Sequence, residues 1–371
     1  MSAITIENDL VHYEALGRGR PVILVHGWLG SWRYWVPTMQ HLSGKYRAYA
    51  LDLWGFGDSG KDANKYAIRD QVSMLFKFFE NMGIRKAVLV GHSLGAAVCL
   101  NFARQYPEFT HRLLLISPPL ADMGGLGEDA PPAAQARPLV APPPKPAEPK
   151  PSLPPAPPPA NVTYSSTSET LPSNPFRALQ QQQPPPSAPP PAPPPSESRP
   201  VPPVLPLSLA TVPAPPPPPP DPSPAQGFAS ILATLTSAKP AALLAKHAAR
   251  DLPDLEMLRA EVSKADELAF LRTAQSLSAQ NLALELKRLM TPTLLLHGEA
   301  DTFLPPPSES LVQRINRGKQ SGYFLPLIEP ALGHFPMLEV AAKFNRLLVD
   351  FLEAPDLSNV QFKDQWKRTI R

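Results

Sequence analysis

One serine lies in a setting that could make its hydroxyl a nucleophile. Ser93 is the middle residue of GHSLG at 91–95, which follows an apolar stretch at 87–90 and precedes an Ala-rich helical pattern at 96–106. A strand, a sharp turn and a helix in this order expose a serine at the apex of the turn, and the flanking glycines let the turn fold tightly. The alternative is an ordinary glycine-containing turn. We expect Ser93 to attack an acyl carbon.

A serine hydroxyl is a weak nucleophile until a base takes its proton, and the chain has eight histidines. His334 lies in Gly-His-Phe-Pro, after the last expected strand, where the preceding glycine can let the imidazole reach back over the sheet. We expect His334 to be the base, with His297 as the second candidate. The other histidines are expected to point away from Ser93 or to be structural: His12, His26, His41, His92, His111 and His247.

The base in turn needs a carboxylate that fixes its tautomer and stabilises the imidazolium. Asp301 lies in HGEAD, just beyond the apolar run 293–296, so it should emerge at the same edge of the sheet as the serine turn. Glu299 and Asp122 are rival positions from which a carboxylate could reach. We expect Asp301 to orient His334.

Acyl transfer also requires hydrogen-bond donors for the oxygen that becomes negative in the transition state. The loop that begins at His26 follows the apolar run 22–25 and can supply one donor. The expected donors are the backbone N–H groups of Trp28 and Leu94. We also expect the side chains of Trp28 and His92 to contact the substrate.

The surrounding elements must bring these residues to one place. Short apolar runs predict strands at 4–6, 10–16, 21–25, 47–51, 87–90, 112–116, 293–297 and 322–327. Helical periodicity lies between them, at 66–82, 96–106, 308–315 and 341–352, and Gly83 should end the first of these helices. The alternation predicts an α/β fold with a mostly parallel central sheet, flanked by helices and built from right-handed crossovers.

The middle of the chain has a different composition. Residues 131–224 contain 38 of the 53 prolines, and this stretch offers few large apolar groups. We expect polyproline II and coil there, with at most a helical turn at 174–183. Its PxxP repeats could bind a proline-recognising partner, although a surface expansion without a partner is the simpler interpretation. Helical segments resume at 241–249, 254–261 and 266–276.

These changes in composition along the chain predict the domain organisation. The expected parts are an N-terminal core segment 1–125, a disordered Pro-rich insertion 126–226, a small helical cap 227–290, a C-terminal core segment 291–355 and a tail 356–371.

Composition narrows the functional classes further. A formal charge of +3 with scattered lysines and arginines does not suggest nucleic acid as a partner. A single cysteine, Cys99, excludes an intramolecular disulfide and a multi-cysteine metal site. No run reaches the roughly 18 apolar residues of a membrane span. We therefore expect a cytoplasmic protein without a membrane span or a metal.

The motifs together resemble the α/β-hydrolase superfamily, in its group with a helical cap. The resemblance covers roughly 1–125 and 226–355 in family order. It rests on HGWLGS at 26–31, DLWGFGDS at 52–59, GHSLG at 91–95, PTLLLHGEAD at 292–301 and GHFPMLE at 333–339. The resemblance implies hydrolysis of an ester, thioester or similar acyl bond of a small molecule through an acyl-enzyme, without a metal or organic cofactor. Similar proteins that open epoxides or displace halide carry aspartate where this chain has Ser93.

Two alternatives stay open. The same triad could perform carbon–carbon bond hydrolysis, perhydrolysis or aminopeptidase action, because the cap and loops decide among these reactions. The core could instead be a non-catalytic scaffold that displays the Pro-rich arm to a partner, although a scaffold has no need for Ser93, Asp301 and His334 together.

Overall fold

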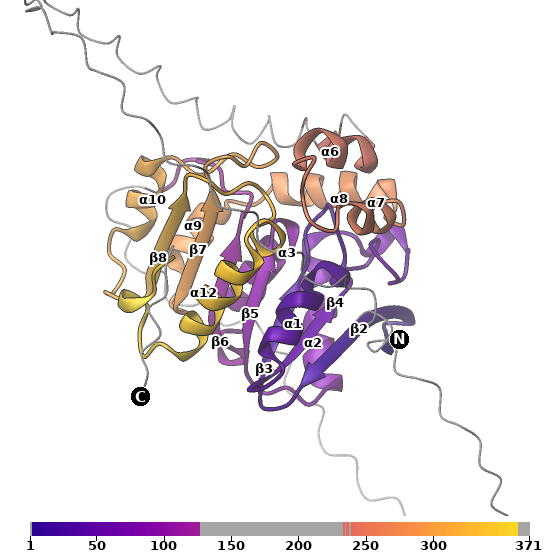
Figure 1. Cartoon of the computed structure of the whole chain (residues 1–371), viewed down its shortest axis with the longest axis horizontal. Helices are drawn as coiled ribbons and strands as arrows, with labels where there is room; N and C mark the ends of the chain where they lie inside the picture. Colours follow the sequence, from indigo (N-terminus) through magenta and orange to yellow (C-terminus); the bar gives the residue numbers. More distant parts are fainter. Residues whose placement is uncertain (1, 127–232, 234, 237–238, 363–371) are drawn as a thin grey trace, which may run out of the picture. The chain divides into compact units, whose positions relative to one another are not determined.

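The computed structural model describes residues 2–126, 233, 235–236 and 239–362, and nearly all of the expected Pro-rich insertion lies outside them (Figure 1). Within the described residues, eight strands form one sheet in the order β1-β2-β4-β3-β5-β6-β7-β8. Their bounds are β1 Ser2–Ile6, β2 Asp9–Gly17, β3 Arg20–Val25, β4 Tyr46–Leu51, β5 Ala87–His92, β6 Thr110–Ile116, β7 Thr293–Gly298 and β8 Phe324–Glu329.

The sheet is mostly parallel, as the sequence predicted. Only β1 with β2, and β2 with β4, pair antiparallel. The two residues that join β1 to β2, Glu7 and Asn8, both have positive φ angles of 51° and 62°. A tight turn with two such residues matches the right-handed twist of the strands that it connects. The parallel strands β3 to β8 therefore all have their carboxyl ends at one edge of the sheet.

Helices cover both faces of the sheet. On one face α1 packs against α12, and on the other α3 packs between α2 and α9, with α10 beside α9 (Figure 1). The bounds are α1 Val36–Leu42, α2 Ile68–Asn81, α3 Leu94–Gln105, α9 Leu282–Arg288, α10 Glu309–Asn316, α11 Pro336–Glu339 and α12 Ala341–Glu353. Gly83 follows α2 with a φ of 65°, and the Ile84 N–H donates to the Phe79 carbonyl, which closes the helix end as predicted.

A separate group of helices lies beside the carboxyl ends of the strands. It comprises α6 Pro240–His247, α7 Leu255–Val262 and α8 Glu267–Ser278 (Figure 1). Polar contacts tie this group to the core. The Tyr66 hydroxyl donates to Asp266 at 2.7 Å, and Arg33 pairs with Glu261 at 2.8 Å. We call α6 to α8 the cap helices.

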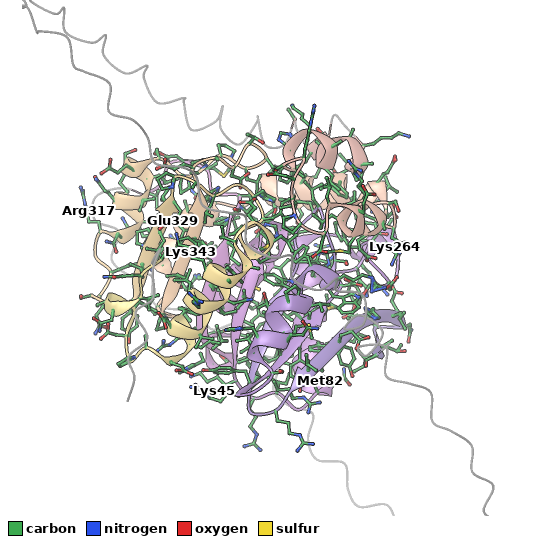
Figure 2. All side chains as sticks on the ribbon, in the orientation of Figure 1. Lys45, Met82, Lys264, Arg317, Glu329 and Lys343 are labelled. Carbon is green, nitrogen blue, oxygen red and sulfur yellow. The ribbon has the colours of Figure 1, made fainter. Side chains whose placement is uncertain are left out.

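The core continues across the long gap in the described chain. Strand β6 pairs in parallel with β7, in a register that joins Leu113 to Thr293. Both strands are buried from Leu113 to Ile116 and from Thr293 to Leu296, so the two described segments share one apolar core. Charged side chains such as Lys45 and Arg317 lie at the outer boundary of the molecule (Figure 2). No helix among the described residues is long and apolar enough to cross a lipid bilayer.

Candidate active site

The turn at Ser93 has a strained backbone geometry. Ser93 lies between β5 and α3 with φ 56° and ψ −115°, a conformation that residues with a Cβ rarely adopt. A Cβ on Gly91 would lie 2.4 Å from the Gly95 carbonyl oxygen, and one on Gly95 would lie 2.3 Å from the Val25 carbonyl oxygen. The two glycines therefore allow the helix to start directly against the strands, which holds Ser93 at the carboxyl edge.

His334 and Asp301 form a buried pair at the same edge. The Nδ1 atom of His334 lies 2.7 Å from Oδ2 of Asp301, and both side chains are almost fully buried. The other carboxylate oxygen, Oδ1, accepts the backbone N–H groups of Phe303 and Leu304, each at 2.9 Å. Because a carboxylate can only accept, Nδ1 of His334 carries the proton in this pair, and Nε2 is then free to accept one.

The surroundings of Asp301 favour its ionised form. Burial by itself raises the pKa of this carboxyl group, but the charges and hydrogen bonds of His334 and His297 outweigh it and hold the pKa well below its ordinary value. The carboxylate is thus negative at neutral pH and can stabilise an imidazolium at His334.

Two reactive atoms, one on Ser93 and one on His334, have no hydrogen-bond partner among the described residues. Both Ser93 Oγ and His334 Nε2 are buried and make no hydrogen bond to any described group. The two loops that carry these residues are adjacent, because the rings of His92 and His334 lie 4.6 Å apart. The Ser93 side chain also borders the loop after β3, since a Cβ on Gly27 would lie 2.5 Å from that of Ser93. Buried polar atoms are rarely left unpaired, and such exceptions mark places where a ligand or water can bind.

The expected oxyanion donors lie on either side of Ser93. Leu94 is the first residue of α3, so its N–H has no acceptor within the helix. Trp28 follows Gly27 in the loop after β3, and its backbone N–H makes no hydrogen bond to another described group. Both amides are therefore available to a negatively charged oxygen above Ser93.

The rival residues occupy other positions. His297 donates from Nε2 to the Leu304 carbonyl at 2.9 Å, so it braces the Asp301 loop. Glu299 is exposed to solvent, and Asp122 forms an ion pair with Arg314. Asp301 Oδ2 lies 2.7 Å from His334 Nδ1 and 3.5 Å from His297 Nε2, so His334 is its closer partner of the two candidate bases.

His92 differs from its expected role. Its ring is fully buried, and both nitrogens have protein partners: Nε2 lies 2.7 Å from the His334 carbonyl oxygen, and Nδ1 lies 2.9 Å from the Tyr34 hydroxyl. No ring nitrogen remains for a substrate, so the structure does not support His92 as a substrate-binding residue. No local sequence pattern indicates Tyr34 as its partner, because the two residues are 58 positions apart.

Trp28 joins the core to the cap helices. Its Nε1 donates to the Thr273 hydroxyl on α8 at 2.8 Å, and its ring makes an edge contact with Phe303. Phe303 also contacts the rings of His334 and of His247, which ends α6. An aromatic wall thus lies between the cap helices and the His334 pair, and His247 belongs to it although the sequence suggested only a structural role.

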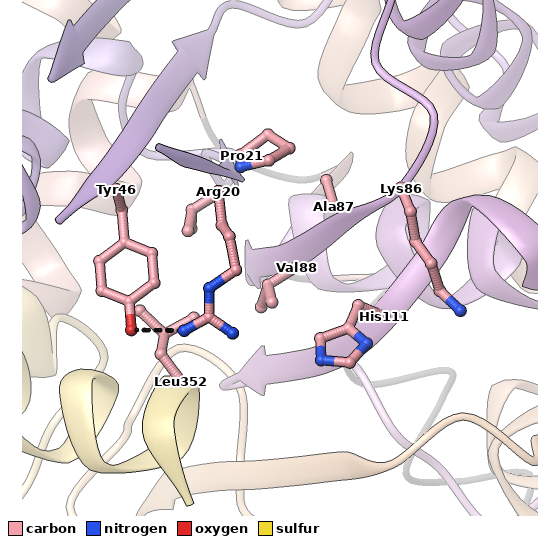
Figure 3. A pocket seen from close by; sticks show the side chains of 9 residues that line it. Arg20, Pro21, Tyr46, Lys86, Ala87, Val88, His111 and Leu352 are labelled. Atoms are coloured by element: carbon pink, nitrogen blue, oxygen red, sulfur yellow. Dashed lines mark hydrogen bonds between the residues drawn. The ribbon is translucent and has the colours of Figure 1, made fainter. Parts of the chain in front are cut away.

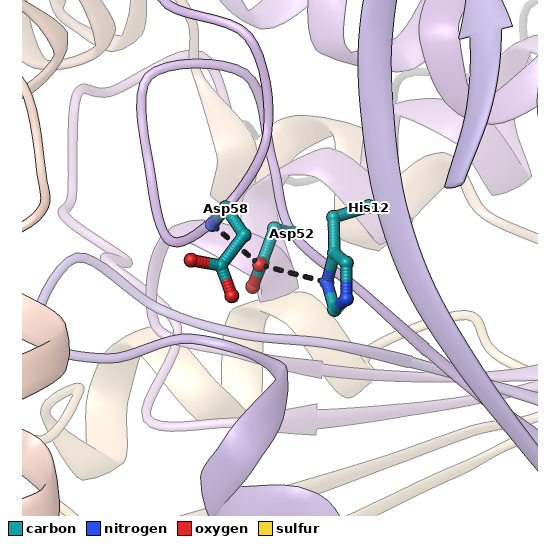
Figure 4. Close-up of side chains that lie close together, drawn as sticks. All are labelled: His12, Asp52 and Asp58. Carbon is teal, nitrogen blue, oxygen red and sulfur yellow. Dashed lines mark hydrogen bonds and ion pairs between the residues drawn. The ribbon is translucent and has the colours of Figure 1, made fainter. Parts of the chain in front are cut away.

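A second cluster of titratable groups has the spacing of metal ligands. It contains His12, Asp52 and Asp58 (Figure 4). However, Asp52 Oδ2 already accepts the Asp58 N–H at 2.9 Å and lies 3.2 Å from His12 Nδ1. Asp58 forms ion pairs with Arg33 and Lys264. These donors and cations occupy the carboxylates, so the cluster serves to hold the loop after β4.

A surface pocket of about 280 Å³ lies at the opposite edge of the sheet. It is lined at the amino ends of the strands by side chains that include Arg20, Tyr46, Lys86 and His111 (Figure 3). Arg20 donates to the Tyr46 hydroxyl at 3.1 Å, and the three basic side chains are exposed. This pocket is separated from Ser93 by the length of the strands and does not belong to the candidate site.

Comparison with known proteins agrees with this architecture. The family model described as alpha/beta hydrolase fold matches residues 20–142. A solved esterase from Exiguobacterium antarcticum superposes with a TM-score of 0.58 over 94% of this chain and 97% of its own, at 14% identity. The chain has the α/β-hydrolase fold, and its N-terminal segment matches the model of that family. At this identity the structural likeness shows the fold alone.

Curated relatives match only part of the chain. A soluble epoxide hydrolase from a Corynebacterium species is 30% identical over 106 residues, which is 29% of this chain and 37% of the relative. A carboxylesterase from Bacillus subtilis is 35% identical over 99 residues, which is 26% of this chain and 33% of the relative. The chain therefore spans about a third of the length of the curated relatives that it matches.

Proposed function

We propose that this α/β-hydrolase is a serine hydrolase that cleaves a carboxylic ester or a similar acyl bond. The observation that carries the proposal is the combination of a strained Ser93 with the His334–Asp301 pair. Ser93 Oγ and His334 Nε2 are both buried without a partner among the described residues, so both atoms are available to a substrate.

The reaction would run in two halves. In the first, Ser93 Oγ attacks the acyl carbon while His334 Nε2 takes the hydroxyl proton, and the oxygen of the tetrahedral intermediate accepts hydrogen bonds from the Trp28 and Leu94 amides. The intermediate collapses, and His334 gives its proton to the departing alcohol. In the second half, a water molecule loses a proton to His334 and attacks the acyl-enzyme. The carboxylic acid leaves, and the proton returns to Ser93. Asp301 stays ionised throughout.

The chemistry of serine favours an acyl substrate over an epoxide, although an epoxide hydrolase is among the relatives. A carboxylate that opens an epoxide forms an ester, which water can then cleave. Ser93 would instead form an ether, and this cannot be hydrolysed by attack on an acyl carbon. An epoxide would therefore alkylate the protein once and stop, whereas an ester allows repeated turnover.

A fluorophosphonate probe tests the proposal directly. We expect the full-length chain to react covalently at Ser93, because the phosphonyl group mimics the tetrahedral intermediate. Ser93→Ala should abolish the labelling and lower ester kcat by at least about 10⁵-fold while the fold is kept. Peptide mass spectrometry locates the modified residue, and hydrolysis of short-chain aryl esters gives kcat.

Ser117 provides a matched control. It also lies at the carboxyl end of a central strand, is buried, has a positive φ of 43° and carries an unpartnered Oγ. Ser117→Ala should still be labelled. Labelling at Ser117 would show that the nucleophile is wrongly assigned. A folded wild-type protein that neither reacts with the probe nor cleaves esters would favour the scaffold alternative.

Substrates of the other reaction classes distinguish the remaining alternatives. The same three side chains could act on a carbon–carbon bond, on a peracid-forming acyl-enzyme or on a peptide. We expect simple carboxylic esters to have the highest kcat/KM, because the alcohol is a better leaving group than a carbanion or an amine. A higher kcat/KM for a 1,3-diketone or an aminoacyl amide would redirect the assignment.

A further inference from the structure

A chain of three short hydrogen bonds runs behind Ser93. The Gly27 N–H donates to the Tyr34 hydroxyl oxygen at 2.7 Å, the hydroxyl lies 2.9 Å from His92 Nδ1, and His92 Nε2 lies 2.7 Å from the His334 carbonyl oxygen. Tyr34 and His92 are both completely buried. We refer to these bonds as the Tyr34–His92 chain.

The direction of every proton in the chain follows from its ends. The His334 carbonyl can only accept, so His92 Nε2 must carry a hydrogen. In the neutral ring Nδ1 then holds a lone pair, which accepts the hydroxyl hydrogen of Tyr34. The Tyr34 oxygen remains free to accept the Gly27 N–H. All donors and acceptors are satisfied by one arrangement. The opposite tautomer would set the Nε2 lone pair of His92 against the His334 carbonyl oxygen and leave that bond unmade.

Both side chains stay neutral in this environment. Burial, which is the main cause, lowers the pKa of His92 well below its ordinary value and raises the pKa of Tyr34 well above its own. A protonated His334 lowers the pKa of His92 further. The tautomer of His92 is therefore held through the pH range in which the base His334 would work.

Each bond of the chain anchors a different segment. Gly27 belongs to the loop that presents the Trp28 amide, His92 immediately precedes Ser93, and His334 carries the base. The packing around the chain is close: the His92 ring lies 4.6 Å from that of His334 and 5.4 Å from that of Phe335. A Cβ on Gly30 would overlap the Tyr34 ring at 2.3 Å, so this glycine gives Tyr34 its position.

We propose that Tyr34 and His92 are positioning residues. They hold the loop that carries Gly27 and Trp28, and the loop that carries His334, in fixed positions relative to the turn at Ser93. Neither side chain touches the substrate. Their hydrogen bonds fix the backbone of the two loops, and this sets where the Trp28 amide and the His334 ring lie relative to Ser93. The inference rests on the proposed function. It adds how the nucleophile Ser93, the base His334 and the Trp28 amide are aligned with one another.

The first test removes one oxygen atom. Tyr34→Phe leaves the ring in place but deprives Gly27 of its acceptor and His92 Nδ1 of its donor. Because small displacements of reacting groups are costly, we expect kcat on an aryl ester to fall roughly 10- to 100-fold while KM changes by less than about threefold. A kcat within twofold of wild type would overturn the proposal, and so would a change confined to KM.

Tyr66→Phe is the matched control. Tyr66 is equally buried, and its hydroxyl donates to Asp266 at the same 2.7 Å, but this bond joins the loop after β4 to the cap helix α8. The substitution deletes a comparable hydrogen bond away from Ser93, so it should lower stability without the selective loss of kcat. Equal losses of kcat in both variants would mean that general destabilisation, and not alignment, explains the effect.

The second test reads the tautomer in the wild-type protein and does not depend on activity or on any variant folding. Nitrogen-15 imidazole spectra of histidine-labelled protein should show His92 with its hydrogen on Nε2 and unchanged between pH 5.5 and 8. A hydrogen on Nδ1, or protonation of His92 within that range, would overturn the proposal. Failure of the wild-type protein to react with a fluorophosphonate would instead contradict the proposed function. The tautomer of His92 would still show whether the hydrogen bonds of the Tyr34–His92 chain are present.

Discussion

At the scale of single residues, the two oxygens of Asp301 have different tasks. Oδ1 binds two backbone N–H groups and fixes the loop, while Oδ2 holds His334 Nδ1. Asp301→Asn replaces one oxygen with an NH2 group that can only donate. We expect the variant to turn the wrong tautomer of His334 towards Ser93 and to lower kcat roughly 10³- to 10⁴-fold, less than Ser93→Ala. Ester hydrolysis at neutral pH measures this loss.

The rival carboxylates supply the controls for this substitution. Asp122→Asn removes an ion pair with Arg314, and Glu299→Gln changes an exposed side chain. Both should leave kcat within a few fold of wild type. A loss in either variant larger than that of Asp301→Asn would mean that the orienting acid lies elsewhere.

At the scale of elements, one partly buried lysine joins three parts of the fold. Lys319 lies between α10 and β8, and its Nζ donates to the carbonyl of Leu289, after α9, at 2.8 Å. Burial, with a smaller contribution from Arg104, lowers the pKa of Lys319 to about 8. The unfolded chain has a pKa near 10.4 at such a side chain. Between about pH 8 and 10.4 the unfolded state therefore binds more protons than the folded state.

The sign of the pH effect follows from this difference. Stability rises with pH wherever the unfolded state binds more protons, so the contribution of Lys319 is largest above about pH 10.4 and is lost as the pH falls from there to about 8. Relative to Lys319→Met, the wild type should gain roughly 2 kcal/mol of unfolding free energy between pH 7.5 and 10, from about 1.4 kcal/mol per pKa unit. Urea unfolding at each pH measures the gain. Lys246→Met, on the exposed side of α6, controls for removing a positive charge, and a flat difference would contradict the prediction.

The strands show which elements a single sequence can predict. The runs at 21–25, 87–90 and 293–297 coincide with β3, β5 and β7 within two residues, because strands buried on both faces are apolar throughout. The last strand was expected at 322–327 but lies at Phe324–Glu329. Gly322 has a φ of 77° and belongs to the preceding turn, and an edge strand with half-exposed residues lacks a clear pattern. The sequence also gave no sign of α1, a seven-residue helix.

The residues of the candidate site also fall into those that the sequence predicts and those that it does not. Residues that follow predicted strands, such as Ser93 and Asp301, could be placed at the carboxyl edge because parallel topology gathers strand ends. The partners of His92 could not be foreseen. Its contacts with Tyr34 and His334 span 58 and 242 positions and depend on how three loops pack together. Local sequence patterns contain no information about such distances.

At the scale of the whole molecule, every strand of the described sheet comes from residues 2–116 or 293–329. We expect replacement of residues 131–224 by a short Gly/Ser linker to leave the melting temperature nearly unchanged and to preserve turnover of a small ester. Loop-closure entropy changes by only about 0.6 kcal/mol for each doubling of length, so the long segment costs the fold little. Calorimetry and hydrolysis of a short-chain ester measure the two outcomes.

Substrate size gives this deletion a second readout. The replaced segment leaves the core after β6 and returns before the cap helices, so kcat/KM for bulky esters can change where that for the smallest ester does not. Unfolding of the shortened chain, or loss of activity on the smallest ester, would show that the segment is an integral part of the cap.

The pairing of β6 with β7 sets an order of events during synthesis. Strand β6 ends at Ile116 and β7 begins at Thr293, so the ribosome must add the intervening residues before the sheet can be completed. At roughly 5 to 20 residues per second this interval lasts on the order of 10 to 35 s. Throughout it, the nascent sheet presents the buried, apolar β6 as an unpaired edge, which is the surface most prone to join another chain. The length of the segment between these strands is therefore also a delay, during which this edge is open to pairing with another chain.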